Sequence, residues 1–351
     1  MSFTPIASSD FVVSSDSVTA PAWSTNAQAL TTFFTASANL TSSYYLDVYN
    51  TTYNASNAAV QFAVAYGHMY GSGSTPLNSL VTQNTPSRIT FGQYRNLIYG
   101  DSTAPVNFGT GNTSSLDLIA IPIDRNRYKG NLFPGTFNLQ LAYGTGSRML
   151  HLTNNSNDVS TITYLDCGRA YDIVSGSDGT SATALAISGV TRGYTASGSY
   201  GLFLPDIGLI VLNPKALQAR PTEGGLGFNF NSLTTAALGW QNHDLIYQII
   251  NSGSAAGSQY SGFVLNSEET ISSDYVFVRV KNAEYNYTSN PSMIDVSGSF
   301  IYPNFVNSPQ TYMTTVGLYN TNNELLAVAK MSKPLVKDFT KESLVRVKLD
   351  W

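Results

Sequence analysis

The stretch from Tyr312 to Trp351 reads YMTTVGLYNTNNELLAVAKMSKPLVKDFTKESLVRVKLDW. Two apolar runs, Met313–Tyr319 and Leu325–Met331, flank the polar segment Asn320–Asn323. Asn tolerates a positive φ angle and bonds to its own backbone, so this segment predicts a hairpin loop. The last residues, Ser343–Trp351, alternate between apolar and polar side chains, which is typical of a half-buried strand. We expect its buried face to carry Val345, Val347, Leu349 and Trp351.

The same alternation recurs along the chain, and only 11% of its residues are charged, against about a quarter in ordinary domains. We therefore predict a mainly β protein with antiparallel, sandwich- or barrel-like sheets and one to three short helices. The predicted strands are Ser43–Tyr49, Val60–Tyr66, Leu116–Ile123, Gly135–Tyr143, Ser147–Leu152, Thr161–Asp166, Leu202–Leu212, Tyr275–Val280 and a weak edge strand, Phe300–Phe305. The predicted helices are Phe91–Ile98 and Trp240–Asn251, whose apolar residues recur at helical spacing.

The chain is long enough for one large β domain or two medium ones. Residues 1–30 are rich in Ser, Thr and Ala, and we predict an extended N-terminal arm that is ordered through a neighbouring chain. We expect a first β domain over residues 31–175 and a second over 200–351, because the segment between them is rich in Gly and Ser.

Several segments resemble virion structural proteins of contractile-tailed phages that infect marine cyanobacteria. The C-terminal run TVGLYNTNNELLAVAKMSKPLVKDFTKESLVRVKLDW carries this resemblance most clearly. Further segments that resemble this group are Val60–Ser74, Gln93–Gly100, Asp124–Leu141, Leu204–Leu217 and Leu265–Ser292. The pattern GLYN…NELLAVAK also resembles a hairpin in the attachment domains of phage tail fibres.

The resemblance implies a structural, non-enzymatic place in the virion, with tail, baseplate or neck as the expected position. It implies copies of the same chain and other virion proteins as partners, and synthesis in the host cytoplasm. Two alternatives stay open: a capsid decoration protein, and a carbohydrate-binding or carbohydrate-cleaving module that recognises a receptor, which the 22 Tyr residues favour.

Charge and hydropathy argue against other partners. The net charge is −4 and the pI is about 5.3, whereas general nucleic-acid binders need an excess of Lys and Arg. The sequence contains no apolar run near the roughly 18 residues of a membrane span, and its start lacks the pattern of a signal peptide. We expect no membrane, nucleic acid or small-molecule substrate.

Residues that could carry chemistry do not form a recognisable motif. The three histidines, His68, His151 and His243, lack the short spacing of a zinc pair, and Cys167 has no partner for a disulfide. The adjacent Glu268 and Glu269 would point to opposite faces of a strand, so they could not flank one glycosidic bond. We predict no catalytic, cofactor-binding or metal-binding residue.

Two groups of cations are candidate interface residues. Arg125, Arg127 and Lys129 cluster beside Asp124, where a salt-bridged loop, a pairing surface for another subunit and a nucleic-acid contact are alternatives. The second group supplies six of the chain's 18 cations in its last 22 residues. It could dock an acidic neighbour or protect exposed strand edges from aggregation. Its members are Lys330, Lys333, Lys337, Lys341, Arg346 and Lys348.

Overall fold

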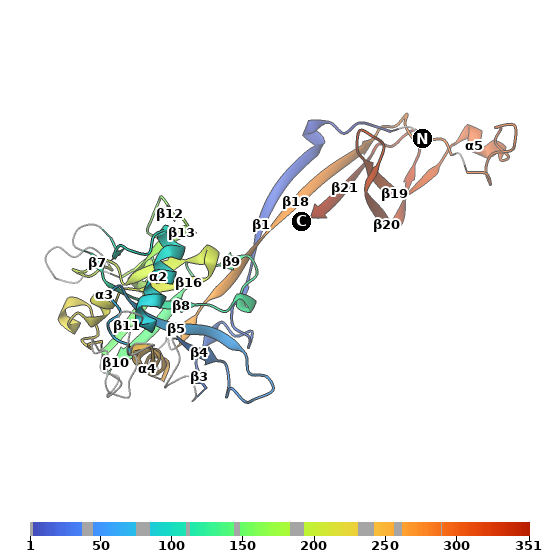
Figure 1. Ribbon diagram of the computed structural model, residues 1–351. Helices are drawn as coiled ribbons and strands as arrows, with labels where there is room; N and C mark the ends of the chain where they lie inside the picture. Colours follow the sequence, from blue (N-terminus) through green and yellow to red (C-terminus); the bar gives the residue numbers. More distant parts are fainter. Residues whose placement is uncertain are drawn as a thin grey trace. The chain divides into compact units, whose positions relative to one another are not determined.

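The computed structural model describes residues 3–36, 45–74, 85–109, 113–143, 148–182, 193–230, 242–255, 262–288 and 290–351. Its contacts divide the chain into two compact units. We call Val18–Glu269 the core unit, and Met1–Ser17 together with Thr270–Trp351 the hairpin unit. Both units consist mainly of antiparallel strands (Figure 1), which confirms the predicted fold class.

The core unit contains a 13-stranded sheet whose strands pair antiparallel. β12 (Thr163–Leu165) and β14 (Thr180–Ser181) pair with β13 at its side, and β6 (Val106–Asn107) pairs with β7 (Ser114–Ser115) separately. The main path of the large sheet runs β2 (Ala29–Leu30), β17 (Phe263–Val264), β10 (Asn138–Tyr143), β11 (Arg148–Asn154), β13 (Gly168–Ser177), β15 (Gly201–Leu204), β16 (Leu209–Leu212), β8 (Asp117–Pro122), β5 (Val60–His68), β4 (Tyr45–Tyr49) and β3 (Phe34–Thr35).

Two helices of 14 residues pack on this sheet, α2 (Pro86–Tyr99) and α4 (Asn242–Ala255). Helix α2 begins where the Thr85 side chain accepts a hydrogen bond from the backbone N–H of Arg88, and it ends at Gly100 in the left-handed conformation. These are the caps that the first and last turns of a helix need. Both predicted helices are confirmed, apart from residues 240–241, which lie outside the described residues.

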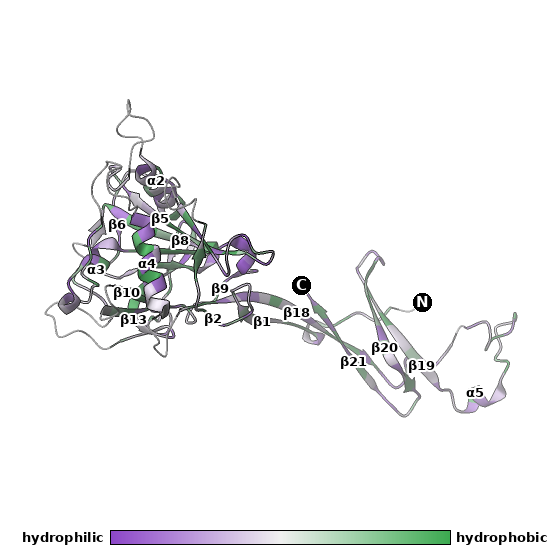
Figure 2. Ribbon diagram, turned by 90° about the horizontal axis from the view of Figure 1, so that it is seen from below, coloured by the Kyte–Doolittle hydropathy of each residue, from purple (hydrophilic) through white to green (hydrophobic). Residues whose placement is uncertain are grey.

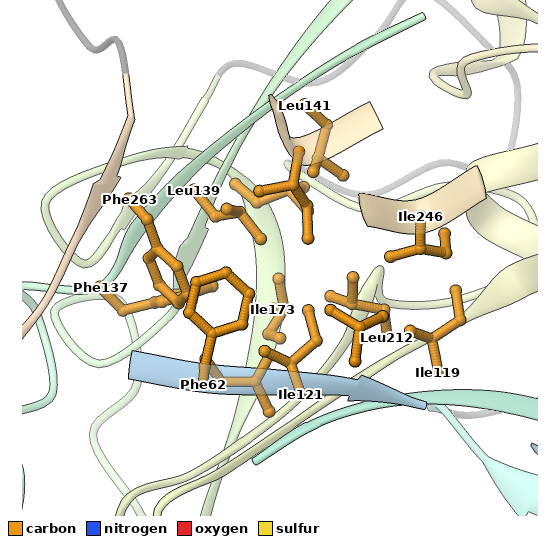
Figure 3. Close-up of a cluster of buried hydrophobic side chains, with 14 of the residues drawn as sticks. Phe62, Ile119, Ile121, Phe137, Leu139, Leu141, Ile173, Leu212, Ile246 and Phe263 are labelled. Atoms are coloured by element: carbon orange, nitrogen blue, oxygen red, sulfur yellow. The ribbon is translucent and has the colours of Figure 1, made fainter. Parts of the chain in front are cut away.

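The two helices cover opposite faces of the sheet. Successive side chains of a strand point to opposite faces, and β8 therefore contributes to two hydrophobic clusters. Ile119 and Ile121 belong to the cluster that includes the isoleucines of α4 (Figure 3), and Leu118 and Ala120 belong to the cluster that includes Phe91 of α2. Because both faces are buried, β8 is apolar at consecutive positions, and Figure 2 shows hydrophobic residues along β8 and β10.

Part of the predicted N-terminal arm lies in the core. Trp23 is only 1% exposed, its ring centroid lies 4.8 Å from that of Phe263, and its Nε1 donates to the carbonyl of Phe263 at 2.8 Å. The preceding strand, β1 (Phe11–Pro21), pairs with β18 (Asn266–Val280) of the same chain. The arm is extended as predicted, but it pairs within its own chain, because β18 offers it a strand edge.

The division into units differs from the predicted boundary near residues 175–200. Strand β13 ends at Ser177 and pairs with β15, which begins at Gly201, so the sheet continues across that segment. The division falls instead inside β1 and β18. The glycines and serines near 175–200 therefore mark a connection between paired strands.

The hairpin unit has two sheets. In the first, β18 lies between β1 and β21 (Ser343–Asp350). The part of β18 that belongs to the core unit, Ser267 and Glu268, pairs with β9 (Asn131–Leu132). The second contains only β19 (Thr311–Tyr319) and β20 (Leu325–Lys337). The predicted edge strand Phe300–Phe305 is wrong, because Pro303 begins the short helix α5 (Pro303–Asn307), where proline fits the first turn.

The remaining predicted strands correspond to strands of the sheets, and Leu202–Leu212 is interrupted at Pro205 by a single 3-10 turn, Pro205–Ile207. Residues 43–44 and 147 of the predicted strands lie outside the described residues. Four α-helices are described, one more than the upper limit predicted, because two of them, α5 and α3 (Pro214–Gln218), have only five residues.

Candidate functional site: an apolar surface on the hairpin unit

The two units differ in how they bury their apolar side chains. Among the described residues, the buried apolar side chains of the hairpin unit are Val276, Val280 and Val347, whereas every other buried apolar side chain belongs to the core unit. Most of the large apolar side chains that are exposed belong to the hairpin unit. An exposed apolar surface of this kind marks a site of protein association.

The hairpin of β19 and β20 forms as the sequence predicts. The Oδ1 atom of Asn320 accepts hydrogen bonds from the backbone N–H of Asn322 at 2.9 Å and of Glu324 at 2.8 Å. Asn323 has a positive φ of 62°, which Asn adopts at lower cost than most residues. The loop therefore closes through local hydrogen bonds of its own side chains.

Both faces of this hairpin carry apolar side chains. In the ladder, Val316 lies opposite Ala329, and these half-buried residues share one face. Val328, opposite Gly317, belongs to the other face and is 57% exposed. Leu326, beside an irregularity in the ladder, is 68% exposed. The five consecutive apolar residues from Leu325 to Ala329 place apolar groups on both faces, because side chains alternate along a strand.

The ladder of β18 and β21 forms a valine-rich face. Val276 lies directly opposite Val347, and Val278 lies opposite Val345. The predicted alternation of the last strand is confirmed, with Val347 buried, Val345 and Leu349 half-buried, and Arg346 and Lys348 exposed. The predicted burial of Trp351 is wrong: it is 74% exposed, and its Nε1 donates to the Asp274 carboxylate at 2.9 Å. Its backbone N–H donates to the Ser272 carbonyl at 2.9 Å, so Trp351 stands at the end of the ladder with its ring exposed.

The opposite face of the same ladder carries cations. Arg346 is exposed and lies over the ring of Tyr275 with its guanidinium carbon 5.5 Å from the centroid. Lys348 pairs with Asp350 at 2.9 Å. Hydrogen bonds from the Ser273 hydroxyl and from Lys348 hold the pKa of Asp350 below its usual value. Arg346 is therefore free of an acidic partner among the ion pairs of the described chain, and it remains a candidate for docking.

One predicted docking cation has an internal role. Lys337 is fully buried, and its Nζ donates to the carbonyls of Asn282 at 2.9 Å and Asp338 at 2.8 Å and to Asn286 Oδ1 at 2.9 Å. Assignment of Lys337 to a docking surface is wrong, because its ammonium satisfies three oxygens inside the unit. It ties the end of β20 to the loop that follows β18.

The other predicted cations of this group are accessible. Lys330 and Lys333 are exposed on β20, and the side chain of Lys341 is 64% exposed, with its Nζ 3.7 Å from Asp338. An exposed ion pair of this length contributes little to stability. These residues therefore stay candidates for contact with a partner.

The cluster at Arg125, Arg127 and Lys129 is a salt-bridged loop. Arg125 donates to the carbonyls of Tyr128 and Lys129, and Arg127 lies 3.9 Å from Asp124. Lys129 Nζ lies 2.9 Å from Glu269. All three cations have partners within the core unit, which favours the salt-bridged loop among the three alternatives. Arg125 and Lys129 are exposed, the latter with 77% of its side chain accessible, and both present surface to a partner, whereas Arg127 is half-buried.

Three side chains that could have carried chemistry, those of His68, Glu268 and Glu269, bond to other groups of the core unit. His68 accepts hydrogen bonds at Nδ1 from the backbone of Tyr70 and Ser72, so it holds its own loop. Glu268 accepts a hydrogen bond from Asn131, and Glu269 pairs with Lys129.

In the described residues no group of three or more His, Cys, Asp or Glu could hold a metal ion. No described helix is long and apolar enough to span a membrane.

Comparison of the chain with protein-family models, with curated proteins and with solved structures gives no match. The exposed apolar surface of the hairpin unit is therefore the candidate functional site. The sequence indicates this apolar surface in the run Leu325–Ala329, whose five consecutive apolar residues must occupy both faces of the strand.

Proposed function

We propose that this protein is a non-enzymatic structural subunit of a phage virion, assembled at the tail, baseplate or neck through the hairpin unit. The observation that carries the proposal is the contrast in burial between the units. A hairpin unit with three buried valines and many exposed apolar side chains needs a protein surface to cover it. A subunit that is permanently packed against its neighbours supplies such a surface.

The sequence resemblance supports the same proposal. Its clearest segment, the run that ends at Trp351, contains β19, β20 and β21. These strands carry the exposed side chains Tyr312, Leu326 and Val328. The C-terminal segment that resembles virion proteins is therefore also the segment that exposes apolar side chains.

The exposed cations of the hairpin unit would orient a partner that packs on the apolar surface. Arg346, Lys330 and Lys333 are exposed, and charges at the edge of an apolar interface select partners and speed their encounter more than they strengthen the complex. The proposed partners are copies of this chain and other virion proteins.

Quantitative mass spectrometry of purified phage particles tests the proposal. We expect the intact chain in the particle, at a copy number that is a multiple of three or six for a tail, baseplate or neck position. Hundreds of copies would favour capsid decoration instead. Absence from the particle, or saturable glycan binding or glycan turnover by the pure protein, would contradict the proposed role.

A further inference from the structure

We infer that the open edge of β21, the side that faces away from β18, receives an extended acidic strand from another virion protein. This strand would continue the sheet of β1, β18 and β21 and would alternate acidic residues with β-branched ones. The inference deepens the proposed function and rests on it, because it names the chemistry of a partner of the hairpin unit. Three features of β21 carry it: its regular pairing, the direction of its backbone groups and its charges.

The regular pairing of β21 leaves a long edge. Among the described strands β21 pairs only with β18, over Ser343–Asp350 and without a register shift. Proteins usually close an exposed edge with a proline, a bulge or a very short strand. β21 contains neither proline nor glycine, and its eight residues are enough to pair with a further strand.

The hydrogen bonds of the ladder show which backbone groups face the open edge. Trp351 donates its backbone N–H to the carbonyl of Ser272 at 2.9 Å, in register with the pairing of β18 and β21. In an antiparallel pair, every second residue bonds to the neighbouring strand. The odd-numbered residues of β21 therefore bond to β18, as Trp351 does. Leu344, Arg346 and Lys348 direct their N–H and C=O groups to the open edge.

The residues whose backbone faces the open edge also carry cations on one face of the sheet. Arg346 and Lys348 are exposed, and both lie over the ring of Tyr275, with the guanidinium carbon and the Nζ atom 5.5 and 5.9 Å from its centroid. A strand beside β21 would place its own side chains next to these cations, where opposite charges stabilise the pair and like charges destabilise it. On the other face it would lie beside Val347 and should be apolar.

The charges argue against a second copy of this chain as the added strand. If two β21 edges paired antiparallel, the registers with the most overlap would place Arg346 opposite Arg346 or opposite Lys348. An acidic strand needs acids two positions apart to face both cations, and no two acidic residues of this sequence have that spacing. The cations that disfavour self-pairing therefore select an acidic strand of a different protein.

A capped peptide that alternates glutamate with valine and is as long as β21 is the probe for this edge. We expect saturable binding to the full chain, followed by nuclear magnetic resonance. The bound peptide should slow amide exchange at Arg346 and Lys348 at least about tenfold. The amide of Val347, which already bonds to β18, should change less. The same peptide with lysine in place of glutamate should bind at least about tenfold more weakly.

Leu344→Pro removes one N–H group from the open edge and keeps both cations. Because this N–H does not bond to β18, the ladder should stay intact. We expect the dissociation constant for the acidic peptide to rise at least about fivefold, the effect of losing one backbone hydrogen bond. Leu344→Ala is the matched control, since it shortens the same side chain and keeps the N–H group. It should bind the peptide as the natural chain does.

Modified peptides repeat the test without changing the protein, and they decide it if Leu344→Pro does not fold. One version is N-methylated at every glutamate, and the other at every valine. A strand added to β21 directs only one of these two sets of N–H groups at the open edge. One version should therefore bind as the unmodified peptide does, and the other should not bind.

The inference is overturned if the acidic peptide does not bind, if the lysine peptide binds equally well, or if both N-methylated versions bind alike. Protection of the Arg346 and Lys348 amides that rises with the concentration of the chain alone would also overturn it, because a second copy would then occupy the edge.

The proposed function is tested separately by particle composition. A chain that is found in particles but does not bind the acidic peptide would overturn only the inference. A chain that binds the peptide at the open edge but is absent from particles would overturn the proposed function and leave the strand site.

Discussion

The Nζ atom of Lys337 lies 2.9 Å from the Oδ1 atom of Asn286 and joins the end of β20 to the loop after β18. A buried ammonium without its acceptors is costly, as are buried acceptors without a donor. Lys337→Met keeps the aliphatic stem but removes the ammonium, and we expect it to destabilise the hairpin unit by about 2–4 kcal/mol.

Urea unfolding monitored by hydrogen exchange within residues 311–337 measures this change. Lys333→Met is the control, because Lys333 is exposed on the same strand and should alter the unfolding free energy by less than about 0.5 kcal/mol. Equal effects of the two substitutions would contradict an internal role for Lys337.

The last strand should depend on Val347 more than on Trp351. Val347→Ala removes two methyl groups from a side chain that is 5% exposed, and we expect a loss of about 2 kcal/mol. Trp351→Ala removes a ring that is 74% exposed, so its cost should stay below about 1 kcal/mol. Chemical denaturation of both variants provides the comparison, and a larger loss for Trp351→Ala would show that its ring is covered.

The contact between α2 and β5 depends on the absence of a side chain at Gly67. A Cβ atom at this position would lie 2.7 Å from the backbone nitrogen of Phe91, and backbone atoms cannot move aside without shifting the helix. We expect Gly67→Ala to destabilise the core unit by about 1–3 kcal/mol.

The control for this prediction lies in the helix itself. At Gly92 the nearest atom to an added Cβ is Ser102 Cβ, at 3.8 Å, which is an ordinary contact. Gly92→Ala should therefore stabilise the protein by about 0.5–1 kcal/mol, because alanine loses less backbone entropy on folding. Thermal unfolding of the two variants should shift in opposite directions.

The stability of the core unit should fall in acid because of His243. Burial lowers the pKa of this imidazole from 6.5 to about 4, although the carboxylate of Asp244 lies 3.5 Å from its Nε2. Below pH 6.5 the unfolded chain binds a proton that the folded chain still excludes, so stability is full above pH 6.5 and declines as the pH falls towards 4. The loss by pH 4 should be about 2–3 kcal/mol.

His243→Gln removes this titration and should flatten the pH dependence between pH 7 and 4. Other groups titrate in both proteins, so the difference between the two pH profiles isolates the contribution of His243. Parallel profiles would mean that the imidazole has the same pKa in the folded and the unfolded chain.

Arg346 should act in assembly and not in folding. It is exposed, and the cation–π contact with Tyr275 spans 5.5 Å, so Arg346→Ser should change the unfolding free energy by less than about 1 kcal/mol. Binding of the acidic peptide should weaken and become less sensitive to salt, since screening acts on the charge that was removed. Titration of the peptide at low and high salt measures both effects, and an unchanged salt dependence would exclude Arg346 from the interface.

The sequence by itself determined the local structure. Period-2 alternation predicted β4 and β21, because the side chains of a half-buried strand divide between two faces. The Asn-rich loop of the C-terminal hairpin was predictable because its hydrogen bonds lie within Asn320–Glu324. In these segments, the residues that decide the conformation are neighbours in the chain.

Only the tertiary structure decided which elements share a sheet and which charges are covered. The chain gives no local sign that Gly201–Leu204 pairs with Gly168–Ser177, so a connection rich in Gly and Ser was predicted to be a domain boundary. In the sequence, Lys337 cannot be told apart from the exposed lysines Lys330 and Lys333. In the structure, its ammonium donates to Asn282 and Asn286, which lie about 50 residues earlier in the chain. Long-range pairing and burial depend on residues far apart in sequence, and local patterns do not encode them.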